Sequence, residues 1–102
     1  MLNKKNKAQL SDSELVKLSQ RNHKHFGVLY EKYFETIFRF IFKRLGADEA
    51  TTGDLTQQTF IKAMASLDSY EDRGFLFCSW LYRIAQNEMN LYFRETKKGI
   101  TI

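Results

Sequence analysis

A run of apolar residues at helical spacing, from Phe26 to Leu45, most constrains how this chain can fold. The apolar residues recur at steps of three and four, which places them on one face of an α-helix. This stripe contains Phe26, Leu29, Tyr30, Tyr33, Phe34, Ile37, Phe38, Ile41 and Leu45. Because Phe40 and Phe42 fall outside the stripe, the predicted helix is apolar around more than half of its girth. We expect it to span about residues 24–45, to end at Gly46 and to lie at the centre of the fold.

The scarcity of helix-breaking residues extends this expectation to the whole chain. There is no proline and there are five glycines among 102 residues, which favours long helices over a β fold rich in turns. This length corresponds to one domain. We predict an all-α fold, a compact bundle of about four helices formed by residues 11–98. Residues 1–10 are expected to be a mobile tail, and residues 99–102 the truncated start of a linker.

Capping signals predict two further helices. Ser11 and Glu14 form a capping-box pattern, which should start a helix that runs to about Asn22. Asp48 suits the N-cap of a helix that runs to about Leu67. The predicted buried side of this second helix contains Ala50, Leu55, Phe60, Ala63, Met64 and Leu67.

The last helix should span about residues 75–98, after a loop at residues 68–74. Its predicted inner side contains Phe77, Trp80, Leu81, Ile84, Ala85, Met89 and Tyr92. Cys78, the single cysteine, is expected to be a buried small hydrophobe, and it cannot form an internal disulfide. The chain has no secretory signal and no segment apolar enough to span a membrane. We therefore expect an intracellular, cytoplasmic protein without a membrane partner.

The charged residues are segregated along the chain. Residues 17–47 carry seven bases and two acids, residues 48–72 carry one base and six acids, and residues 73–102 carry five bases and two acids. This order suggests a polyanion as the partner of the basic regions and a different partner for the acidic helix. The alternative is that charged side chains merely keep the helix faces solvated.

No set of residues has the spacing of a catalytic or metal site. His23 and His25 are two apart, so they point in different directions on a helix. Asp68, Glu71 and Asp72 lack the spacing of an EF-hand calcium loop. We therefore expect no enzyme activity, cofactor, bound metal or small-molecule substrate.

Polar residues define two candidate binding surfaces. The outward face of the last helix carries Ser79, Arg83, Gln86, Asn87, Asn90, Arg94 and Lys98. Amides and guanidinium groups can pair with base edges, although an ordinary solvated helix carries similar groups. In the preceding loop, Tyr70 and Arg73 with Phe75 can stack on bases, or the aromatic rings can close the edge of the core. One side of the third helix carries Asp54, Gln57, Gln58 and Lys62, which suits either partner docking or solvation.

Three stretches together resemble region 2 of the sigma factors of bacterial RNA polymerase, in the extracytoplasmic-function (ECF) group. They are FGVLYEKYFETIFRFIFKRLG, DLTQQTFIKAM and SYEDRGFLFCSWLYRIAQN, and the resemblance covers about residues 24–98. The pattern DL-x-Q-x-x-F, followed at this spacing by WLYRIA-x-N, is the specific part. The resemblance implies an all-α domain that acts in transcription initiation.

The resemblance also implies roles for individual residues. Asp54, Gln57 and Gln58 would bind the β′ clamp helices of core RNA polymerase, with Met64 touching the same partner. The loop around residues 69–73 and the last helix would recognise the promoter −10 element and capture a flipped base of the non-template single strand. The implied DNA-binding residues are Ser69, Tyr70, Arg73, Ser79, Arg83, Gln86, Asn87 and Asn90, with Arg94, Lys97 and Lys98 on phosphates. Trp80, in the family's WL pair, is interpreted chiefly as a core anchor.

The chain departs from the family pattern at several positions. Gln58 stands where Glu is usual, Gln86 where Arg is frequent and Leu91 where Asp is frequent, and Glu95 interrupts the arginine run that follows Arg94. These departures imply an altered polymerase contact and weaker DNA affinity. The family's region 4 is absent from the sequence, so we expect a fragment, and an anti-sigma factor is a further candidate partner. The alternatives are a helical protein-interaction domain of the same fold without promoter reading and, more remotely, a small helical enzyme.

Overall fold

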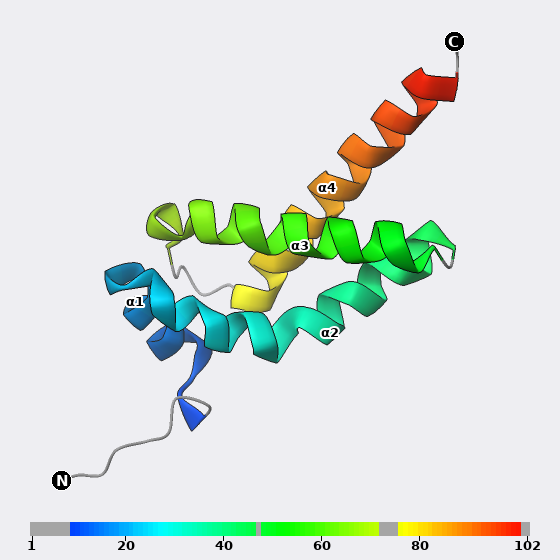
Figure 1. The fold of residues 1–102 in the computed structure, drawn as a ribbon. Coiled ribbons are helices and arrows are strands. Elements are labelled where there is room, and N and C mark those ends of the chain that lie inside the picture. Colours follow the sequence, from blue (N-terminus) through cyan, green and yellow to red (C-terminus); the bar gives the residue numbers. More distant parts are fainter. Residues whose placement is uncertain (1–8, 47, 72–75, 101–102) are drawn as a thin grey trace, which may run out of the picture.

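The computed structural model describes residues 9–46, 48–71 and 76–100, with the backbone alone for residues 97–100. In chain order its elements are α1 (Asp12–Arg21), η2 (His23–His25), α2 (Phe26–Leu45), α3 (Glu49–Ala65), η3 (Leu67–Ser69) and α4 (Phe77–Ile100), where η marks a 3-10 turn. Every regular element of the described residues is helical (Figure 1). The prediction of an all-α fold with four helices is confirmed.

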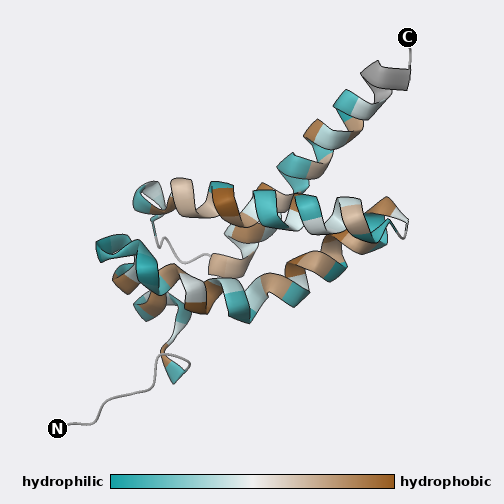
Figure 2. Cartoon of the chain, viewed as in Figure 1, coloured by the Kyte–Doolittle hydropathy of each residue, from teal (hydrophilic) through white to brown (hydrophobic). Residues whose placement is uncertain are grey.

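The helix α2 lies at the centre, as its wide apolar surface predicts, and it packs against α1, α3 and α4. In Figure 1 α2 and α3 run side by side, and α4 crosses behind α3. Figure 2 shows hydrophobic residues spread along much of α2. The helix ends at Gly46, which adopts φ 71° and ψ 48°, the left-handed conformation that glycine reaches without steric cost. The predicted stop is therefore confirmed.

The core joins aromatic residues of α2 to one phenylalanine of α3. Phe60 of α3 lies with its ring centroid 6.4 Å from Phe26, 5.0 Å from Tyr30 and 6.3 Å from Phe34. Rings at these separations gain attraction beyond the area that they bury. The buried hydrophobic residues are Leu15, Val16, Phe26, Leu29, Ile37, Ile41, Leu55, Phe60, Ala63, Leu67, Phe77, Leu81, Ala85 and Met89.

The buried side of α3 differs from the prediction. Ala50 is exposed, whereas the fully buried positions include Thr52, Thr56 and Thr59. The three hydroxyls donate to backbone carbonyls four residues earlier, at 2.7, 2.7 and 2.8 Å. Because each buried hydroxyl is satisfied within the helix, the threonine methyl groups can face the core.

The boundaries near the predicted loop also shift. The helix α3 ends at Ala65, with Ser66 as its C-cap, and the chain then tightens into η3, so Leu67 reaches the core from a 3-10 turn. The first residue of α4 is Phe77. Phe75, where the last helix was predicted to start, lies outside the described residues.

The C-terminal half of α4 projects beyond the other helices (Figure 1). Leu91 and Phe93 on this part are 37% and 46% exposed. Cys78, predicted to be buried, is half-buried. Residues 1–8 of the predicted tail and residues 101–102 lie outside the described residues, while Leu10 packs partly against the core. No helix within the described ranges combines the length and apolarity needed to cross a membrane.

Candidate functional site

One candidate surface is the exposed edge of α3. Asp54, Gln57 and Gln58 are all exposed there, as the sequence predicted. Ile61 lies one turn further along the same edge and is 55% exposed, although the sequence interpretation did not include it. Its spacing is the signal that could have identified it, because Ile61 follows Gln57 by four residues and Gln58 by three and so lies on the same helix face. The edge therefore combines polar groups with an apolar side chain, which suits protein docking.

A groove of about 310 Å³ adjoins this edge. It is lined by His23, Phe26, Gly27, Tyr30, Gln57, Phe60, Ile61 and Met64. The half-buried Met64 and the exposed Gln57 thus face one space. Asp54 and Gln58 are not part of its lining, so the groove meets only one side of the predicted docking edge.

Lys62 does not belong to this edge, although its spacing suggested so. Its ammonium group lies 2.7 Å from the Glu88 carboxylate of α4. Glu88 is only 6% exposed, and its ion pair with Lys62 joins α3 to α4 in the lining of a second concave surface. A buried carboxylate requires such a partner, which explains why Lys62 turns toward α4.

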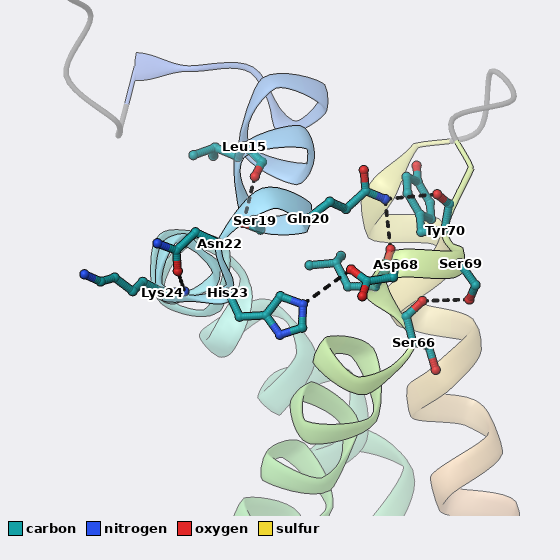
Figure 3. Close-up of polar contacts among 11 residues, drawn as sticks. Leu15, Ser19, Gln20, Asn22, His23, Lys24, Ser66, Asp68, Ser69 and Tyr70 are labelled. Carbon is teal, nitrogen blue, oxygen red and sulfur yellow. Dashed lines mark hydrogen bonds and ion pairs between the residues drawn. The ribbon is translucent and has the colours of Figure 1, made fainter.

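The start of the predicted base-capture loop is attached to α1 (Figure 3). The side-chain amide of Gln20 donates to the carbonyls of Leu67 and Tyr70, at 2.9 and 3.2 Å. His23 lies 3.4 Å from the Asp68 carboxylate. No pattern in the sequence pointed to Gln20, because it meets residues about fifty positions away. Its contacts fix where the chain leaves η3.

The aromatic residues near this loop close the edge of the core. The Tyr70 ring lies 4.9 Å from Trp80 and 5.7 Å from Phe77, and Trp80 lies 5.6 Å from Phe77. Tyr70 and Trp80 are both half-buried, so each also presents part of its ring outward. Among the remaining predicted loop residues, Ser69 is exposed, whereas Arg73 lies outside the described residues.

The predicted face of α4 is accessible. Ser79, Arg83, Asn87, Asn90 and Arg94 are exposed, and Gln86 is half-exposed. The Gln86 amide donates to the Asn90 side-chain oxygen at 3.0 Å, which orients both groups. The side chains of Lys97 and Lys98 lie outside the described residues. The structure thus brings together the described members of the predicted DNA-binding set that lie on α4.

Part of this face borders the second concave surface, between α3 and α4. It has a volume of about 460 Å³ and is lined by Lys62, Ser66, Ile84, Asn87, Glu88, Asn90, Leu91 and Arg94. Asn87, Asn90 and Arg94 therefore face a common space beside the Lys62–Glu88 ion pair. Ser79, Arg83 and Gln86 are not in its lining. The α4 face consists of a concave part and an open part.

The titratable groups indicate structural roles. Burial and the hydrogen bond to Asp12 raise the pKa of the Tyr33 hydroxyl well above its usual range. Lys32 contacts the same carboxylate at 2.6 Å. These contacts link α1 to α2. No group of three or more His, Cys, Asp or Glu side chains is arranged for a metal ion among the residues that the structure describes.

A family model, Sigma-70 region 2, matches residues 29–99, which include α3, η3 and most of α2 and α4. The chain belongs to the sigma-70 region 2 family. The matched range contains every predicted site residue of this region 2 domain, from Asp54 on α3 to Lys98 on α4.

Curated relatives place the domain in the ECF group. It is 35% identical over 85 residues to the ECF RNA polymerase sigma factor BldN of Streptomyces coelicolor, covering 82% of this chain and 32% of BldN. It is 31% identical to the ECF sigma factor SigM of Bacillus subtilis, covering 72% of this chain and 44% of SigM. The ECF sigma-E factor of Escherichia coli is 33% identical, covering 82% of this chain and 43% of that protein. The chain thus spans less than half the length of these relatives.

A solved structure has the same fold. It is an NMR structure of an engineered region 2 of sigmaE in complex with GTAAAA. The two chains superpose with a TM-score of 0.81 at 30% identity, covering 92% of this chain and 97% of the other. The likeness therefore extends over nearly the whole domain, including the helices that carry both candidate surfaces.

Proposed function

We propose that this region 2 domain recognises a promoter −10 element and helps to hold its opened non-template strand during transcription initiation. The observation that carries the proposal is the accessible face of α4, whose amide and guanidinium groups project from a fold that matches a sigma region 2 in complex with GTAAAA. Amides and guanidinium groups are the side-chain groups best suited to reading base edges. The half-buried Tyr70 and Trp80 offer ring surface beside this face for an unstacked base.

Melting would require no catalysis by the domain. When a base leaves the duplex stack, its capture by stacking and hydrogen bonds offsets part of the cost of unpairing. The pre-oriented Gln86–Asn90 pair supports this role, since groups already held in place lose less conformational entropy on binding. The domain would thus act by shifting the equilibrium between paired and opened promoter DNA toward the opened form.

We further propose that the exposed edge of α3 binds the β′ clamp helices of core RNA polymerase. Asp54, Gln57 and Gln58 would supply polar contacts, and the groove beside Gln57 would receive an apolar side chain. The concave part of the α4 face is lined by other residues, so DNA and polymerase would use separate surfaces. This separation allows each surface to be tested alone.

The DNA surface is tested by replacing Arg83 and Asn87 together with alanine in a full-length protein that contains this domain. Each lost base contact costs about 1–3 kcal/mol, so promoter-specific initiation should fall at least about tenfold. In vitro transcription from a cognate promoter measures this. Binding to the β′ clamp helices should stay unchanged in the same variant. Normal initiation by the double variant would contradict the DNA role of α4.

The polymerase surface is tested by the reciprocal variant, in which Asp54 and Gln57 are replaced by alanine. Loss of two polar contacts at roughly 1 kcal/mol each should weaken clamp-helix binding about thirtyfold in a pull-down titration. Single-stranded DNA binding should be retained. Equal clamp affinity of the variant and the unchanged protein would remove the α3 edge from the interface.

A further inference from the structure

A third concave surface lies between the C-terminal half of α2 and α4. Its volume is about 360 Å³, and it is lined by Thr36, Arg39, Phe40, Lys43, Arg44 and Tyr82. Half of these residues have basic side chains, and none has an acidic side chain. The sequence resemblance assigned no role to this surface, which we call the α2 cationic groove.

Aromatic contacts hold one of the basic side chains of the groove in position. The Arg44 guanidinium lies 4.1 Å from the centroid of the Phe40 ring, and this ring packs 4.7 Å from Tyr82 of α4. One Arg44 nitrogen donates to the Phe40 carbonyl at 3.5 Å, and stacking leaves the other donors available at the edge of the guanidinium. Two half-buried aromatic rings therefore support the exposed guanidinium of Arg44.

Most of this positive charge is not neutralised by the protein. Arg39 pairs with Glu35 at 2.8 Å, but both side chains are more than 70% exposed, so this pair contributes little. Neither Lys43 nor Arg44 lies within salt-bridge distance of a carboxylate in the part of the chain that the structure describes. The groove is therefore suited to an anionic ligand.

The groove adjoins the proposed DNA surface. Tyr82 lies three residues after Ser79 and four residues before Gln86, so these side chains neighbour one another on α4. Arg39 and Arg44 are separated by about 7.5 Å along α2, at a rise of about 1.5 Å per residue. This length spans about two nucleotide steps of one DNA strand, whose phosphates are spaced by about 3.4 Å along the duplex axis.

We propose that Arg39, Lys43 and Arg44 bind the phosphodiester backbone of the promoter and thereby extend the DNA surface from α4 onto α2. The inference rests on the proposed function, because it assigns the same ligand to a second set of residues. Phosphate contacts supply affinity and register without reading sequence. The groove would thus strengthen binding to any DNA that occupies the α4 face.

The test measures the salt dependence of DNA binding by the 102-residue chain. The groove variant is Lys43→Gln with Arg44→Gln. The matched control is Arg21→Gln with Lys24→Gln, which removes the same charge from two exposed residues that precede α2, the last residue of α1 and the middle residue of η2. Lys24 points away from the loop (Figure 3). The probes are a single strand that contains GTAAAA, its scrambled form, and the same strand joined to an upstream duplex. Thermal unfolding of each variant verifies that it is folded.

The groove variant should bind about tenfold more weakly at 0.1 M salt, with a log–log salt slope smaller by about 2, one unit for each lost phosphate contact. The control should keep the original slope, and the ratio between GTAAAA and scrambled strands should not change. If the groove variant binds both the single strands and the strand joined to a duplex more weakly, the contact is with the single strand. If it binds only the strand joined to a duplex more weakly, the contact is with the duplex.

An unchanged slope in the groove variant, or an equal loss in the control, would overturn the inference. So would a groove variant that binds DNA normally but loses the clamp helices, since the ligand would then be an acidic protein surface. If the salt slopes of the original chain and the groove variant differ as expected, but neither protein prefers GTAAAA over the scrambled strand, the result would contradict the proposed promoter recognition alone.

Discussion

At the scale of single residues, Asp48 shows how one side chain starts a helix. Its carboxylate accepts hydrogen bonds from the backbone amide of Thr51 at 3.1 Å and from the Thr51 hydroxyl at 2.7 Å. These two bonds hold the pKa of Asp48 below its ordinary value of 3.8, because they favour the charged form. The α3 helix, which carries the proposed polymerase-binding edge, therefore begins at an ionised cap.

This cap predicts a pH dependence of stability. Since the pKa of Asp48 is lower in the folded chain, the cap stabilises the fold above pH 3.8, and this contribution is lost as the pH falls through the lower folded value. Denaturant unfolding of the original chain and of Asp48→Asn, from about pH 7 to about pH 2, measures it. The stability difference between the two should be largest near neutral pH and should shrink in acid. A difference that is constant over the whole range would show that the carboxylate charge contributes nothing.

Side-chain contacts between residues close in sequence were predicted, whereas contacts between residues far apart in sequence were missed. The caps at Ser11 and Asp48 were predicted because each bonds to a residue three positions later. The burial of Glu88 was not predictable, because its partner Lys62 lies on another helix. The buried threonines were missed because a side chain that satisfies its own helix carries no apolar signature.

At the scale of elements, α1 is the support of the loop that precedes α4. Gln20 is the link, since its amide bonds to two carbonyls at and just after η3. The predicted helix boundaries were close for α1 and α2, where capping and glycine signals are strong. The end of α3 was placed two residues too late, because Leu67 belongs to η3, whose position depends on contacts from α1 as well as on local propensity.

Replacement of Gln20 by leucine should lower the free energy of unfolding by roughly 1–3 kcal/mol, since the two hydrogen bonds from the Gln20 amide to the carbonyls of Leu67 and Tyr70 would be lost. Urea unfolding followed by circular dichroism measures this loss. Gln58→Leu is the matched control on the exposed edge of α3, where the same change should stay within about 0.5 kcal/mol. Equal stabilities of the two variants would contradict the role of Gln20 as a link between α1 and η3.

At the scale of the whole molecule, the three concave surfaces share no lining residue. The exposed edge of α3 carries the proposed polymerase contact, and the face of α4 carries the proposed DNA contact. Periodicity correctly predicted the exposure of Asp54, Gln57 and Gln58 on α3 and of most of the named polar residues on α4, but it wrongly grouped Lys62 with the α3 edge. The concave surfaces could not be predicted, since each depends on side chains contributed by two packed helices.

The most direct test of promoter recognition is selection of single-stranded DNA by the 102-residue chain from a pool with six randomised positions. The proposal predicts enrichment of one related set of sequences, with single mismatches each weakening binding by about tenfold, and loss of this enrichment in the Arg83→Ala, Asn87→Ala variant. Binding to the β′ clamp helices without any enrichment of DNA would contradict the proposal, and would identify the domain as a protein-interaction module of sigma fold.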